Sequence, residues 1–166
     1  MNLLRAIEAS NFSVWVRESG SIWSYPTIIF FHSVGLAIIV GLSTAIDLRV
    51  LGFAPGVPVA PLEKLFPIMW VGFWVNAVSG LFLAMADAPA MVTSWLFLLK
   101  MAIIGLAVIT MASLKRELFR PTTSGDALSR AAKALAVMSL LLWTGAIAAG
   151  RLTAYLGPSA EIKGLN

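Results

Sequence analysis

Four long apolar stretches constrain the fold of this chain of 166 residues more than any other feature. A helix needs about 20 mainly apolar residues to cross a bilayer. The chain is 59% hydrophobic and only 12% charged, whereas soluble domains carry roughly 25% charged residues. We therefore expect an all-α integral membrane protein with a single transmembrane domain over residues 1–166. The predicted spans are about 25–47, 66–86, 94–114 and 131–156.

Short polar segments with prolines separate the four stretches. Residues 52–61 contain three prolines, residues 87–93 contain Pro89, and residues 115–130 contain Pro121. Short connections make consecutive helices antiparallel, so we expect an up-and-down four-helix bundle. Residues 1–20 carry scattered charges without a continuous apolar run, which argues against a secretory signal. They predict one short amphipathic helix on the membrane surface.

The distribution of lysine and arginine predicts an orientation. The second loop has none, while the first and third loops are basic, and such loops face the cytoplasm. Both termini are then periplasmic, in a bacterial inner (cytoplasmic) membrane. The net charge of +4 is explained by contact with anionic lipid, so no nucleic-acid partner is expected. The loop cations are Arg49, Lys64, Lys115, Arg116, Arg120, Arg130 and Lys133.

Small residues recur every four positions in two of the spans. The first span has such a stripe from Ser33 to Ala45, and the fourth pairs Gly145 with Ala149. Small residues at this spacing let helix backbones approach closely in lipid. The stripes exceed what four spans need among themselves, which predicts a homo-oligomer or a subunit of a larger membrane complex.

His32, the only histidine of the chain, lies inside the first span. Ionisable residues in spans face the bundle interior and mark sites, and neutral imidazole is the usual axial ligand of haem b. Gly35, one turn further on, would leave room for a porphyrin edge. Lys100 and Arg151 would pair with the propionates, and Tyr155 is predicted at a similar depth. A purely structural hydrogen bond between helices remains the alternative role for His32.

The sequence offers several candidates for the other parts of a haem site. A second axial ligand would be Met69, Met85 or Met101, or His32 of a second protomer, and a five-coordinate iron is also compatible with the sequence. For Lys100 and Arg151 the alternative is snorkelling to the headgroups. Aromatic walls are available from Phe30, Phe31, Trp74 and Trp143.

Copper is an alternative ligand, since thioether sulfur suits Cu(I). The candidate set is Met85, Asp87 and Met91 around the outer loop, with His32 below. Methionine is also a common gap-filler in apolar cores. A proton path from His32 to Asp47 is a further possibility, although an interfacial ion pair between Asp47 and its neighbour Arg49 accounts for that carboxylate more simply.

Several reaction classes find no support. The absence of cysteine excludes disulfides, thiolate metal sites and covalent haem attachment. No nucleophile–base pair, phosphate loop or zinc motif occurs, which argues against a hydrolase or a kinase. The sequence makes no positive prediction of enzyme activity.

Three segments form a wider pattern, residues 21–52, 70–88 and 140–155, with His32, Gly35, Asp47, Leu48, Arg49, Leu51, Gly52, Gly150, Arg151 and Tyr155 as its characteristic positions. In this pattern the chain resembles a family of bacterial four-helix membrane proteins described only as a domain of unknown function. It is similar, more distantly, to the membrane domain of copper-resistance D-type proteins. The resemblance implies a fold and a candidate site, and no reaction.

Three functional hypotheses follow. The leading one is a small membrane protein that binds haem b in the outer leaflet and serves as an electron-transfer subunit. The alternatives are a copper-handling membrane protein and a non-catalytic accessory or scaffold subunit.

Overall fold

The chain folds into the expected all-α bundle. The structure, a computed structural model, describes residues 2–120 and 128–156, with side chains of the last helix described as far as Leu152. Within these residues four helices are long and apolar enough to cross a membrane, which makes this a multi-pass membrane protein. They are α3 (Tyr25–Leu51), α4 (Leu65–Met85, preceded by the 3-10 helix η1, Ala60–Lys64), α6 (Trp95–Leu118) and α7 (Arg130–Leu156).

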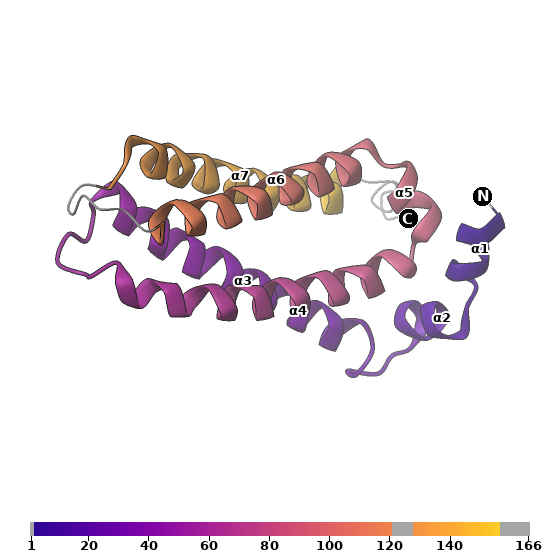
Figure 1. Cartoon of the computed structure of the whole chain (residues 1–166). Helices are drawn as coiled ribbons and strands as arrows, with labels where there is room; N and C mark the ends of the chain where they lie inside the picture. Colours follow the sequence, from indigo (N-terminus) through magenta and orange to yellow (C-terminus); the bar gives the residue numbers. More distant parts are fainter. Residues whose placement is uncertain (1, 121–127, 157–166) are drawn as a thin grey trace.

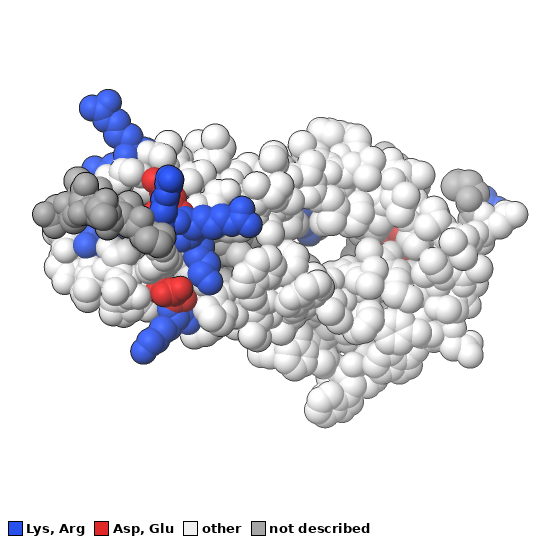
Figure 2. All heavy atoms as spheres, in the orientation of Figure 1, with Lys and Arg blue, Asp and Glu red and all other residues white. Residues whose placement is uncertain are grey.

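The four long helices pack as two antiparallel pairs. α3 packs on α4, α6 packs on α7, and α3 also contacts α7 (Figure 1). The up-and-down order predicted from the short connections is confirmed. In the space-filling view an opening separates the two pairs beside the short helix α5 (Ala88–Thr93), and positive charge is visible inside it (Figure 2).

The two ends of the bundle differ in charge. Lysine and arginine gather where α3 and α6 end and α4 and α7 begin, which we call the basic end (Figure 2). We call the opposite end, which carries α5, the α5 end. At the basic end α3 runs four residues past its predicted end at Asp47. It stops at Gly52, whose φ of 99° is the left-handed conformation that terminates many helices.

The N-terminal segment differs from the prediction of one amphipathic helix. It forms two, α1 (Asn2–Glu8) and α2 (Asn11–Glu18), because Ser10 caps a new helix by accepting a hydrogen bond from the backbone N–H of Ser13 at 3.3 Å. Val16 of α2 is fully buried against the bundle. The Arg17 guanidinium donates to the carbonyl of Ala86 at 2.9 Å. The apolar face of α2 thus covers the α5 end of the bundle.

The main apolar core fills the half of the bundle nearer the basic end. Its members come from all four long helices, and Met69 among them is 1% exposed. A smaller buried cluster at the α5 end joins Val16 of α2 to Ile28 and Ala86. The buried members of the core are Ile39, Ile46, Val50, Phe66, Met69, Ala107, Met111, Leu114, Ala132, Ala136, Trp143 and Ala146.

The two small-residue stripes lie in different surroundings. On α7, Gly145 lies against Ile103 and Gly150 against Lys100, so this face of α7 packs on α6. The stripe of α3 faces outward: Ser33, Ala37, Gly41 and Ala45 are all exposed, and nothing in the described chain lies within 4 Å of a Cβ placed on Gly41. The close approach of α3 to α4 uses other small residues.

Candidate functional site

Two glycines bring α3 and α4 into backbone contact. A Cβ on Gly35 would lie 2.6 Å from the backbone N of Asn76 and 2.7 Å from the carbonyl O of Gly72. On Gly72 it would lie 2.7 Å from Cγ2 of Ile38. No side chain fits at such distances, so only glycine permits this crossing. The crossing sets the register in which α3 side chains meet α4, one turn away from His32.

His32 and Asn76 form a reciprocal hydrogen-bonded pair across this crossing. Nδ1 of His32 lies 2.9 Å from the backbone O of Asn76 and 3.2 Å from Oγ of Ser79. The Asn76 side-chain amide donates to the backbone O of His32 at 2.7 Å. Because a carbonyl only accepts, Nδ1 carries a proton, and in the neutral imidazole Nε2 then keeps its lone pair. Within the described residues no hydrogen bond engages Nε2.

Gly80 makes room for the imidazole ring. A Cβ at this position would lie 2.9 Å from Cε1 of His32, which is too close for a side chain. The sequence pattern did not single out Gly80. Gly80 faces His32 only because of the register in which α3 packs on α4. The spacing of glycines along α4 does not predict that register.

Lys100 and Arg151 occupy neighbouring positions on the other helix pair. The half-buried Lys100 of α6 places Cε and Nζ 3.7 Å from the Cβ position of Gly150 on α7. Lys100 and His32 are close enough for a Coulombic interaction. Arg151 is exposed on α7. The side chain of Tyr155 lies outside the described residues. Of the predicted polar partners whose side chains are described, Lys100 is the one that interacts with His32.

Several predicted parts of a haem pocket are placed elsewhere. The space beside Gly35 is filled by α4, so no porphyrin edge can lie there. Phe30, Phe31 and Trp74 point outward, and Trp143 is buried in the main core. Hydrophobic spans expose aromatic side chains to lipid, so their presence in a span does not place them at a site.

The predicted sulfur ligands are also scattered. Met69 is buried in the main core and Met101 is exposed on α6. Met85 ends α4, five residues beyond Gly80, or about 7 Å along the helix axis. Asp87 and Met91 lie still further along, before and within α5. No group of three or more His, Cys, Asp or Glu side chains suited to a metal occurs in the described part of the chain. The copper set therefore receives no support.

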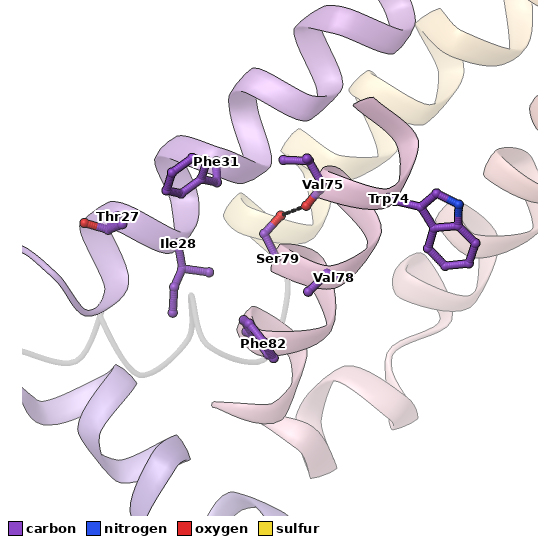
Figure 3. Close-up of a pocket in the computed structure, with 8 residues that line it drawn as sticks. All are labelled: Thr27, Ile28, Phe31, Trp74, Val75, Val78, Ser79 and Phe82. Carbon is purple, nitrogen blue, oxygen red and sulfur yellow. Dashed lines mark hydrogen bonds between the residues drawn. The ribbon is translucent and has the colours of Figure 1, made fainter. Parts of the chain in front are cut away.

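An apolar groove of about 450 Å³ lies between α3 and α4, and its lining does not include His32. Figure 3 shows Ile28, Phe31, Val78 and Phe82 around it. Its lining hydroxyls are occupied, since Ser79 donates to the carbonyl of Val75 at 2.6 Å and Thr27 to that of Ile22 at 2.7 Å. The groove has the character of a lipid-facing surface.

The predicted ion pair of Asp47 with Arg49 is wrong. Asp47 is 0% exposed, whereas the Arg49 guanidinium donates to the carbonyl of Val57 at the basic end. The extra turn of α3 beyond Asp47 carries this carboxyl into the bundle, where Ser43 lies 3.4 Å from it.

No protein-family model, curated protein or solved structure matches the chain. The family resemblance of the sequence therefore stays a prediction, and the function has to be argued from the site itself.

Proposed function

We propose that this protein is a membrane-embedded subunit that binds haem b for electron transfer, with Nε2 of His32 as the axial ligand. The observation that carries the proposal is the hydrogen bond from Nδ1 of His32 to the backbone carbonyl of Asn76. Histidines that ligate metals almost always donate their other ring N–H to a carbonyl, a carboxylate or water. That bond selects the tautomer and holds the ring in one orientation.

The surroundings of His32 agree with this role. Gly80 lets the ring pack closely against α4, and the Asn76 side chain donates to the backbone O of His32 itself. Lys100 is within Coulombic range of His32 and would pair with a propionate, while Arg151 would reach one only from the exposed side of α7. Bound haem would supply one-electron chemistry. The chain would supply the axial nitrogen, the charge partner and the apolar surroundings.

The methionine positions favour a single axial ligand from this chain. Met69 and Met101, two of the three candidate sulfurs, lie in the main core and on the exposed surface. A five-coordinate iron would follow, unless a second protomer provides its own His32. Five-coordinate haem has an open position, so the protein as purified is expected to bind carbon monoxide once reduced.

The charge asymmetry supports the proposed location. Lysine and arginine gather at one end of the bundle (Figure 2), and cytoplasmic loops carry this excess. We infer that the basic end faces the cytoplasm of a bacterial inner membrane. The α5 end with His32 would then lie in the outer leaflet, and the N-terminus would be periplasmic.

Assembly with further subunits stays a prediction. The outward stripe of α3 includes Gly41, where a Cβ would meet nothing within 4 Å in the described chain, so a leucine at this position would fill the stripe. If the stripe packs on another helix, Gly41→Leu should lower the mass of the particle measured by light scattering in mild detergent. An unchanged mass would remove the stripe from any assembly.

An absorbance spectrum tests the function directly. The protein, purified from native membranes in mild detergent, should show a Soret band and sharp α and β bands after dithionite reduction. A haem-to-protein ratio near one is expected after titration with hemin. A flat visible spectrum that hemin does not change would contradict the proposal. Metal analysis of the same sample would reveal copper if that alternative holds.

A further inference from the structure

A buried polar layer joins α3 to α7 in the half of the bundle nearer the basic end. Ser43 Oγ lies 3.0 Å from Ser139 Oγ and 3.4 Å from Oδ2 of Asp47. Asp47 and Ser139 are 0% exposed and Ser43 is 2% exposed. This layer is independent of the haem proposal, since 15 residues of α3 separate Asp47 from His32, or about 22 Å of helix.

The Asp47 carboxyl lacks the partners that an ionised carboxylate needs. Its Oδ1 has no hydrogen-bond partner, and Trp143, one turn beyond Ser139, also has an unpartnered N–H. These are the only two such buried side-chain atoms in the described residues. Side chains lean towards the N-terminus of their helix, so Asp47 and Trp143 lean towards each other from antiparallel helices. The layer is polar and buried, and not all of its hydrogen-bonding atoms have partners.

No cation compensates Asp47. In the described residues none of the charged groups on the elements around it forms an ion pair with it. The Arg49 guanidinium faces Val57, and the Lys115 ammonium lies 5.7 Å from the ring centroid of Phe66. A bare carboxylate in an apolar core would be strongly disfavoured. The other charged groups on these elements are Glu63, Lys64, Lys100, Arg116, Glu117, Arg130, Lys133 and Arg151.

We propose that Asp47 is a proton-binding site, with its carboxyl protonated in the folded bundle. A protonated Oδ2 donates to Ser43, and Ser43 then donates to Ser139, which completes a chain of hydrogen bonds. In the ionised state the only donors to the carboxylate would be the hydroxyls of Ser43 and Ser139, and Oδ1 has no partner in the described residues. Binding converts –COO⁻ and H⁺ into –COOH, so releasing the proton leaves a charge between α3 and α7. Proton occupancy would thereby control the packing of this pair.

A metal or sodium ion fits the layer less well. Hard cations take about six or more oxygen ligands. The layer offers the two oxygens of Asp47 and two hydroxyls. A proton requires only one of these oxygens, so it is the ligand that the donor set supports.

Infrared spectroscopy of the whole protein in detergent tests the site. A protonated carboxyl has a carbonyl stretch separate from those of carboxylates and amides. At neutral pH this band should be present, should shift when aspartate is labelled with ¹³C, and should disappear in Asp47→Asn. Glu63→Gln, which removes an exposed acid at the same end, should keep the band.

Other outcomes would overturn the proposal. A wild-type protein without a band sensitive to labelled aspartate would have an ionised Asp47, and a band that survives Asp47→Asn would belong to another residue. If Asp47→Asn does not fold, Ser139→Ala should shift the band by removing the end of the chain, and an unmoved band would contradict the geometry. A Tm that rises with sodium at fixed pH in the wild type, but not in Ser43→Ala, would identify a cation site instead.

The pH dependence of stability gives a second readout. Asp47 keeps its proton in the bundle, whereas an aspartate of the unfolded chain loses its proton at about pH 4. The wild-type Tm should therefore fall as pH rises from about 4 towards the pH at which the folded bundle releases the proton, and that fall should be absent from Asp47→Asn. Equal pH profiles of the two proteins would show that the carboxyl does not change its charge.

Discussion

Replacement of His32 by glycine is expected to abolish the Soret band while leaving the bundle folded. The substitution removes the proposed axial nitrogen and leaves a cavity of imidazole size between α3 and α4, bounded by Gly80, Asn76 and Ser79. Free imidazole should enter that cavity and restore the band. We would measure the absorbance of the purified variant with and without imidazole. Circular dichroism would report its helix content.

Ser79→Ala is a milder change at the same site. It removes the weaker of the two contacts to Nδ1, 3.2 Å from Ser79, and keeps the carbonyl of Asn76. Loss of such an outer partner typically costs about 10- to 100-fold in metal affinity. Hemin titration should place Ser79→Ala between wild type and His32→Gly. A full Soret band in His32→Gly without imidazole would show that another residue holds the iron, and would overturn the proposed site.

Gly35→Leu is expected to separate α3 from α4. The new Cβ alone would lie 2.6 Å from the Asn76 backbone N and 2.7 Å from the Gly72 carbonyl O. These are helix backbone atoms, which cannot rotate away as a flexible side chain would. Overpacking in a tight interior costs about 1–3 kcal/mol and sometimes more. We expect at least about 3 kcal/mol here, because the whole crossing has to move. Thermal unfolding in detergent, followed by circular dichroism, measures the change.

Gly105→Leu is the matched control. Gly105 lies within α6, is exposed, and has nothing within 4 Å of its Cβ position in the described chain. The same change of residue there should leave the Tm close to that of the wild type. If Gly35→Leu and Gly105→Leu unfold at the same temperature, the α3–α4 crossing does not depend on a glycine at position 35. The crossing also positions His32, so Gly35→Leu should weaken hemin binding as well.

The sequence was sufficient to predict the architecture, because the hydropathy of a segment alone determines whether that segment can span a membrane. A stretch that is apolar over about 20 residues has to be a helix in lipid, whatever its neighbours are. The four spans and their up-and-down order followed from this and from the short connections. The cations at the ends of these spans likewise predicted the basic end that the structure shows. The end of α3 was missed by one turn, since Asp47 reads as an interfacial charge when only its neighbour Arg49 is considered.

The tertiary structure decided which residues share a site, because packing register has no local signal in a chain that is apolar all round. The sequence identified His32 as the singular residue, but only the crossing at Gly35 and Gly72 places it on Asn76, Ser79 and Gly80. The same register turns the stripe of α3 outward and Asp47 inward, against Ser139 of α7. Contacts of this kind depend on the angle and offset between two helices, which side-chain volumes determine together along their whole length.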